Sequence, residues 1–393
     1  MIPVPKGYSF AAVPAGFKKD RNDLAVIVSD RPAVAAGVFT TNRFQAAPVL
    51  VARERLERAD AMRAVVINAG QANACTGEAG LADCLESCRL LAEALGLEEG
   101  EILPASTGVI GVRMPMDKWA TAMPLVQANL GQAAATDFAR AIMTTDAFPK
   151  MAAARLTSPD GKECAIFGMA KGAGMICPNM ATMLGVVLTD AEVAPEQWRS
   201  VLRAAVDASF NRVTVDGDTS TNDCVFALAN GASGVTIGDG ELQGLAEGVA
   251  QVCQTLAYMI VQDAEGGSKV VRIHVSGARS MGDAEIVART IGHSPLVKTA
   301  MYGRDPNWGR IVAALGRSGV DFNPGDVNLS LCGIPIFAKG APIPQDHKAL
   351  LAPHMRRQDI HIHLSIGSGP GSYVLLASDL THEYVTINAE YTT

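Results

Sequence analysis

The centre of the chain, residues 171–184, carries a lysine, two glycines, a proline and a threonine in one short run. The two glycines predict a bend or a close backbone approach, and Pro178 favours an extended backbone at Cys177. Thr182 stands near the start of an apolar run, 183–188, that predicts a buried strand. A hydroxyl group at the start of a strand, after a glycine loop that carries Lys171, is a plausible nucleophile.

The same run also fits an ordinary connection between two strands. A glycine loop before a strand is usually a turn, and threonine is a common strand residue. The phosphate-loop order G-x-x-x-x-G-K-[ST] is absent, and the Gly172-x-Gly174 pair lacks its third glycine because Cys177 stands there. The residues by themselves therefore leave a catalytic and a purely structural interpretation open.

A second run with chemical potential is STGVIG at 106–111. Thr107 offers a hydroxyl group and Gly108 an unhindered backbone amide, and such a loop can supply hydrogen-bond donors to the oxyanion of an acyl-transfer reaction. The small-residue run at 68–77 could place several amides around a ligand. A plain turn is an equally good interpretation of both runs.

The run KGAGMICPNMATML, 171–184, resembles the self-cleavage segment of the ornithine acetyltransferase family, the glutamate N-acetyltransferases of arginine biosynthesis. The resemblance extends over nearly the whole chain, through the runs QANACTG, STGVIG, TTDAFPK, VDGDTSTND, DPNWGR and INAEYTT. It implies that the chain cuts itself between Ala181 and Thr182. It also implies that Thr182, once it is the N-terminal residue of a fragment, is the nucleophile.

The resemblance implies roles for further residues. Thr107 and Gly108 would form the oxyanion hole. Lys171 would pair with a substrate carboxylate or assist formation of the oxyanion, and Glu265 would hold a substrate ammonium group. The family's TTDTFPK motif contributes one substrate-contacting threonine, which the sequence leaves open between Thr144 and Thr145. The implied substrate-binding set is Thr144, Thr145, Lys171, Thr182, Glu265, Asn388 and Thr393.

The implied reaction moves an acetyl group from N2-acetyl-L-ornithine to L-glutamate through an acetyl-Thr182 intermediate, with ping-pong kinetics. The α-amino group of Thr182, with a reference pKa of about 8, would accept the hydroxyl proton. The sequence leaves open whether acetyl-CoA is a further acetyl donor. One alternative is an N-terminal-nucleophile amidohydrolase, related to aminopeptidases, that passes the acyl group to water. Another is a non-catalytic binding protein in which Thr182 is buried and inert.

Composition limits the classes of protein. The net charge of −7 and the pI of about 5.6 argue against a nucleic-acid surface. No apolar stretch reaches the length of a membrane span, and the N-terminal residues lack the apolar core of a secretory signal. Eight cysteines without a C-x-x-C pair fit reduced thiols in a cytoplasmic protein. The acidic run at 216–223 lacks the spacing of an EF-hand, so neither a metal nor a nucleotide cofactor is indicated.

These residues must be held by alternating strands and helices. Apolar periodicity predicts helices at 81–95, 132–143 and 242–260, a helix that Pro195 opens, and strands at 24–28, 36–39, 64–68 and 164–169. Alternation of this kind predicts an α/β (α+β) fold with mixed sheets. The resemblance implies an αββα-type layered sandwich in which two self-cleaved fragments form one unit. They would be an alpha chain, 1–181, with the oxyanion-hole and substrate loops, and a beta chain, 182–393, whose C-terminal tail enters the active site, assembled as a heterotetramer or larger.

Overall fold

The computed structural model describes residues 3–177 and 183–390, which divide into two compact units. Of these residues, unit 1 takes 3–177, 183–211 and 218–260, and unit 2 takes 212–217 and 261–390. Unit 1 therefore contains strands from both of the predicted fragments. No helix in the described ranges combines the length and apolar character needed to cross a bilayer.

Unit 1 is built on one mixed sheet in the order β4-β3-β2-β9-β7-β6-β5, with β1 paired to β2. The strand β2, Leu24–Phe39, belongs to two parts of this sheet. Its first half pairs with β1, its second half pairs with β9, and β3 pairs with the first half and, after an irregularity, with Ala33 and Val34. The predicted strands at 24–28 and 36–39 are thus one strand with an irregular middle. The other strands are β1 Tyr8–Val13, β3 Ala61–Gln71, β4 Ile102–Val109, β5 Lys150–Thr157, β6 Glu163–Lys171, β7 Leu184–Thr189 and β9 Cys224–Ala229.

The two parts of the sheet pack face to face. Alternate side chains of each strand point to opposite sides of the sheet, so each part has an inner and an outer face. Phe10 and Ile27 of the first part share one buried cluster with Phe167 and Phe226 of the second part. The neighbouring residues of β1 and β2 point the other way, into a cluster with helices α2, Gly77–Leu95, and α3, Met116–Asn129. One outer face of the sheet layers is therefore covered by helices.

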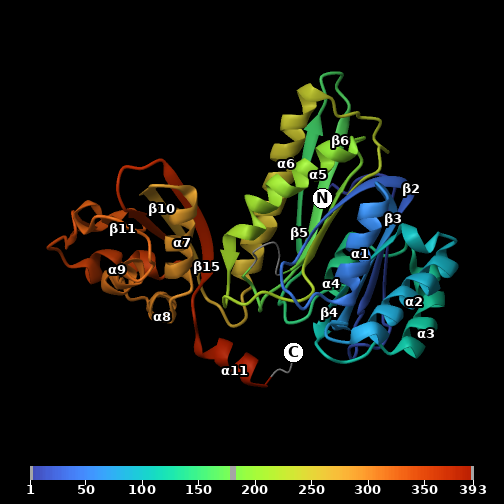
Figure 1. Ribbon diagram of the computed structural model, residues 1–393, viewed down its shortest axis with the longest axis horizontal. Coiled ribbons are helices and arrows are strands. Elements are labelled where there is room, and N and C mark those ends of the chain that lie inside the picture. The colour runs from blue at the N-terminus through green and yellow to red at the C-terminus, as the bar shows by residue number, and fades with distance from the viewer. Residues whose placement is uncertain (1–2, 178–182, 391–393) are drawn as a thin grey trace. The chain divides into compact units, whose positions relative to one another are not determined.

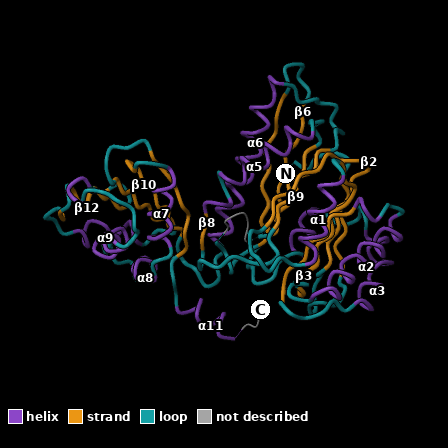
Figure 2. Tube along the Cα trace, viewed as in Figure 1, coloured by secondary structure: helices purple, strands orange, loops and turns teal. Residues whose placement is uncertain are grey.

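Helices α5, Pro195–Asp207, and α6, Asp239–Gln262, cover the opposite outer face (Figure 1). Gly168 of β6 makes room for α6, since a Cβ atom there would lie 2.5 Å from Val252 and 2.8 Å from Leu256. The layer order is helix, sheet, sheet, helix, so the predicted αββα class with mixed sheets is confirmed. Figure 2 shows the strands of unit 1 between its helices.

Most of the predicted helices of unit 1 are present with shifted ends. The helix predicted at 81–95 begins earlier, at Gly77, and Pro195 is the first residue of α5 as predicted. The helix predicted at 132–143 is shorter, because α4 covers only Ala135–Ala141. Sequence periodicity gave no indication of α3, whose interior contains Pro124, or of α1, Ala47–Arg58.

Unit 2 contains a second mixed sheet in the order β13-β12-β11-β14-β10-β15-β8. In β14, Asp359–Ser365, only every second residue is buried, and the buried side chains share a core with α7, Met281–Gly292. The strands are β8 Val213–Thr214, β10 Val270–Ala278, β11 Asn328–Leu331, β12 Ile334–Ala338, β13 Ala341–Pro342, β14 Asp359–Ser365 and β15 Gly371–Ser378. The helices are α7 Met281–Gly292, α8 Pro295–Tyr302, α9 Trp308–Gly316, α10 His347–Met355 and α11 His382–Glu390.

Candidate active site

The central glycine run connects two neighbouring strands of unit 1. Lys171 is the last residue of β6, and it pairs in the antiparallel register with Leu184, the first residue of β7. The predicted strands at 164–169 and 183–188 are confirmed, and every residue of β7 is buried. Ala181, Thr182 and Thr393 lie outside the described residues, so the cleavage bond, the nucleophile and the terminal substrate contact stay predictions.

The Lys171 side chain joins two of the other predicted site residues. Its Nζ atom donates to Thr144 Oγ1 over 2.6 Å and lies 3.3 Å from Thr107 Oγ1. Lys171 is only 8% exposed, so its ammonium group depends on such partners for hydrogen bonds. Thr145 makes no hydrogen bond to Lys171 among the described residues. The side chain that faces Lys171 is therefore that of Thr144.

Gly108 occupies a position that only glycine fits. Its φ of +134° lies in a region that side-chain-bearing residues rarely adopt. It pairs with Gly70 of β3, and a Cβ atom on Gly108 would lie 2.3 Å from the Gly70 carbonyl carbon. The two backbones approach closely here, which fixes the position of the adjoining Thr107.

Two asparagines hold the segment just before Thr107. The Ser106 hydroxyl donates to Asn68 Oδ1 over 2.6 Å. Asn222 donates through Nδ2 to the carbonyl oxygens of Ser106 and Ala72, at 2.9 and 2.5 Å. The acidic run at 216–223 thus contains a residue, Asn222, that positions the predicted oxyanion-hole segment. Within the described ranges, no group of three His, Cys, Asp or Glu side chains is placed to hold a metal ion.

A buried ion pair lies beside the same cluster, and it was not among the predicted site residues. Lys150 Nζ and Asp146 Oδ1 are 2.7 Å apart, with both side chains fully buried. Asp146 also accepts from the backbone amides of Gly172, at 2.7 Å, and Thr144, at 3.0 Å. Burial would raise the pKa of the Asp146 carboxyl group, but the charges of Lys171 and Lys150 hold it well below its usual range. The only indication of this ion pair in the sequence is that the run TTDAFPK contains an acid and a lysine four residues apart.

Two predicted substrate contacts meet within unit 2. Asn388 of α11 donates through Nδ2 to Glu265 Oε2 over 2.9 Å. The Thr381 hydroxyl, just before α11, donates to the Gly266 carbonyl oxygen over 2.7 Å and accepts from the Tyr384 amide. The segment after Glu265 therefore anchors the start of the C-terminal helix, and the helix returns Asn388 to Glu265.

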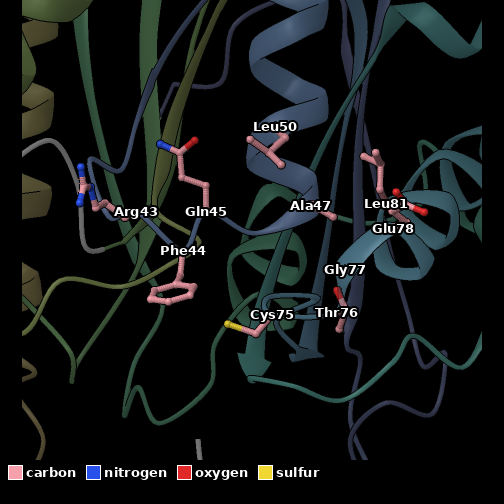
Figure 3. A pocket seen from close by; sticks show the side chains of 10 residues that line it. All are labelled: Arg43, Phe44, Gln45, Ala47, Leu50, Cys75, Thr76, Gly77, Glu78 and Leu81. Carbon is pink, nitrogen blue, oxygen red and sulfur yellow. The ribbon is translucent and has the colours of Figure 1, made fainter.

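A surface pocket with a volume of about 310 Å³ lies at the start of α1 and α2 in unit 1 (Figure 3). Figure 3 shows Phe44 and Cys75 at the lower part of this pocket and Leu50 and Leu81 above them. None of the predicted site residues lines it. The full lining is Arg43, Phe44, Gln45, Ala47, Leu50, Cys75, Thr76, Gly77, Glu78 and Leu81.

The αββα fold gathers the hydroxyl groups of Thr107 and Thr144 around the ammonium group of Lys171, an arrangement that fits the class of α/β acyl-transfer enzymes. A model of the ArgJ family matches residues 9–393. The chain belongs to the ArgJ family, and the predicted enzyme class, an acyltransferase of arginine biosynthesis, is confirmed.

Individual relatives agree with the family match. The chain is 60% identical over 388 residues to the arginine biosynthesis bifunctional protein ArgJ of Nitratidesulfovibrio vulgaris, with 98% of each chain covered. It is 47% identical to the ArgJ protein of Dehalococcoides mccartyi, covering 100% of this chain and 97% of that one. A solved ArgJ structure from Bacillus halodurans superposes with a TM-score of 0.51 at 34% identity, covering 53% of this chain and all of that one.

Proposed function

We propose that the protein transfers an acetyl group from N2-acetyl-L-ornithine to L-glutamate, with Thr182 as the acyl-carrying nucleophile. The observation that carries this proposal is the hydrogen-bonded group of Lys171, Thr107 and Thr144. The group stands at the end of the strand that leads into the predicted cleavage segment. Its donors suit an acyl-transfer reaction, in which negative charge develops on a carbonyl oxygen.

The first event is self-cleavage. The Thr182 hydroxyl attacks the Ala181 carbonyl carbon, the peptide bond to the Thr182 nitrogen breaks, and the acyl group moves to the oxygen as an ester. Water then hydrolyses this ester, which leaves a carboxylate on Ala181 and a free α-amino group on Thr182. The products are the fragments 1–181 and 182–393, which remain together because strands from both build the sheet of unit 1.

The second event is acetyl transfer. The α-amino group of Thr182 accepts the hydroxyl proton, and the oxygen attacks the acetyl carbonyl carbon of N2-acetylornithine. The C–N bond breaks, the proton passes to the departing amine, and ornithine leaves an acetyl ester on Thr182. The amine of glutamate then attacks that ester and regenerates the hydroxyl. Thr107 and the Gly108 amide stabilise the oxyanion in each step, and such a donor contributes about 3–4 kcal/mol in comparable sites.

The remaining residues of the predicted set bind substrate in this proposal. Lys171 receives the substrate carboxylate, with Thr144 as its neighbour. Glu265, with Asn388 hydrogen-bonded to it, receives an ammonium group, and Thr393 completes the set. Acetyl-CoA as a second donor, a cytoplasmic location, and assembly of the fragments as a heterotetramer or larger belong to the same proposal.

Intact mass under denaturing conditions tests the first event. Wild-type protein is expected to give two fragments that join at Ala181-Thr182, and Thr182→Ala a single full-length chain. A single uncut wild-type chain in folded protein would remove the terminal amine from the mechanism.

Product analysis tests the second event. Wild-type protein with N2-acetylornithine should release ornithine and form N-acetylglutamate only when glutamate is present. Release of acetate without glutamate would instead identify an amidohydrolase. Formation of N-acetylglutamate with acetyl-CoA as the sole donor would show bifunctional activity, and its absence would show monofunctional activity. Native mass spectrometry gives the number of fragments in the assembly.

A further inference from the structure

A second lysine, Lys18, lies beside the Lys171 cluster in unit 1. It belongs to the connection between β1 and β2, and the buried carboxylate of Asp23 fixes its backbone. Asp23 accepts from the Ala15 amide over 2.7 Å and from the Lys18 amide over 2.6 Å. The start of the Lys18 side chain is therefore held in place by the fold.

The Lys18 side chain crosses the strand pair that carries the predicted oxyanion hole. A Cβ atom on Gly70 would lie 3.3 Å from Lys18 Cγ, so the aliphatic stem of the lysine rests over this glycine. Gly70 pairs directly with Gly108. The side chain ends at Thr144, where Lys18 Nζ donates to the carbonyl oxygen over 3.2 Å. Lys18 thus spans from the oxyanion-hole strands to the substrate threonine.

Thr144 consequently receives two ammonium groups, Lys18 on its carbonyl oxygen and Lys171 on its hydroxyl oxygen. Burial lowers the pKa of Lys18 to about 8, with further contributions from the positive charges of Arg21 and Lys171. Among the described residues, no carboxylate forms an ion pair with Lys18. The nearby acid Asp146 is occupied by Lys150 and two backbone amides. Two neighbouring cations of this kind favour a bound anion.

We propose that Lys18 is a second cationic contact for the carboxylate of the amino-acid substrate, acting together with Lys171. This inference rests on the proposed function, because both N2-acetylornithine and glutamate carry an α-carboxylate. Lys18 binds and orients the substrate, and it transfers no proton. A substrate carboxylate near both ammonium groups would relieve the repulsion between them.

The test compares substrates that differ only in the charge at this carboxylate. N2-acetyl-L-ornithine and its carboxamide are assayed with wild-type protein and with the Lys18→Met, Lys18→Arg and Lys19→Met variants. Lys19 is the matched control, since it is the next residue in the chain and is exposed. Lys18→Met is expected to lower kcat/KM for the carboxylate substrate roughly 10- to 100-fold, mainly through KM, the loss typical of one hydrogen bond to a charged group.

The carboxamide distinguishes a contact with the substrate charge from a merely structural role, because a structural defect would lower kcat/KM for both substrates alike. Lys18→Met should lower kcat/KM for the carboxamide by less than about threefold, because no charge pairs with the lysine there. Lys18→Arg should restore most of the carboxylate preference, and Lys19→Met should match wild type with both substrates. An equal loss with both substrates would overturn the proposal and leave Lys18 as a support for the Thr144 backbone. No loss with either substrate would overturn it as well.

Calorimetric binding of ornithine and ornithinamide separates failure of this inference from failure of the proposed function. If wild-type protein transfers no acetyl group but still prefers ornithine to ornithinamide, and Lys18→Met loses that preference, only the proposed reaction fails. If wild-type protein transfers acetyl and the variant keeps the full preference, only the role of Lys18 fails. Absence of both transfer and binding would overturn both.

Discussion

Lys150 and Asp146 form an ion pair of 2.7 Å in which neither side chain is exposed to solvent. The same carboxylate accepts the backbone amides of Gly172 and Thr144. One buried acid therefore ties the first residue after Lys171 to the threonine that Lys171 contacts. Through these contacts the ion pair fixes the backbone next to Lys171 and Thr144, two residues of the predicted substrate-binding set.

Breaking this pair should cost stability. Lys150→Met removes the ammonium group that forms the ion pair with the buried Asp146 carboxylate, and the loss of one partner of a buried pair costs about 3–5 kcal/mol of unfolding free energy. Chemical denaturation of the purified protein measures the loss. The control is Arg155→Met, which breaks the exposed pair with Glu163 and should change stability little. Similar, small effects of the two substitutions would contradict a structural role for the buried pair.

The Thr107 hydroxyl should matter to the rate of the chemical step. Thr107→Val keeps the branched shape and removes the donor, so kcat should fall roughly 100- to 1,000-fold, as for other oxyanion-hole donors. Thr107→Ser retains the hydroxyl group and should keep most of the activity. Steady-state kinetics on fully cleaved protein give both values. A Val variant with the wild-type kcat would exclude this residue from the oxyanion hole.

The two adjacent threonines should differ in their effect on substrate binding. Thr144→Val removes the acceptor of the Lys171 ammonium group, so KM for N2-acetylornithine should rise about tenfold, the cost of a hydrogen bond to a charged group. Thr145→Val should leave KM near its wild-type value. Initial-rate measurements over a range of substrate concentrations make the comparison. The reverse order of effects would show that the arrangement around Lys171 does not govern binding.

Lys298 should make the stability of unit 2 depend on pH. Lys298 belongs to α8 and is buried. Its ammonium group donates to the carbonyl and hydroxyl oxygens of Ser378. Burial lowers the pKa of Lys298 to about 8 from an ordinary value of 10.5, against the opposing charges of Asp379 and Asp216. Between these two pH values the unfolded chain binds more protons than the folded chain, so the unfolding free energy increases as pH rises.

The measurement is denaturation at several pH values from about 8 to 10.5, in wild-type protein and in Lys298→Met. The wild-type stability should increase relative to that of the variant as pH rises across this window, and the relative gain should be lost as pH falls through about 8. A constant difference between the two proteins over the window would show that Lys298 keeps an ordinary pKa in the folded state.

Local sequence patterns were sufficient for several strands and helices of unit 1, but they did not indicate β1, β4, β5 or β9. The apolar run at 183–188 predicted β7 within one residue, because a fully buried strand needs an apolar side chain at nearly every position. Pro195 marked the start of α5 through its fixed backbone angle. Periodicity failed for α3, since Pro124 stands inside that helix and the tertiary packing of Trp119 and Val126 outweighs its local preference.

The sequence by itself determined the family, the α/β class and the motifs that carry the predicted site, because those features are encoded in short runs of residue types. Only the tertiary structure decided which side chains meet. Thr144 rather than Thr145 faces Lys171, Asp146 is buried against Lys150, and Lys18 reaches Thr144 from 126 positions away. The physical reason is that strand register and chain crossings bring distant residues together, and no local pattern records which of two neighbouring side chains points inward.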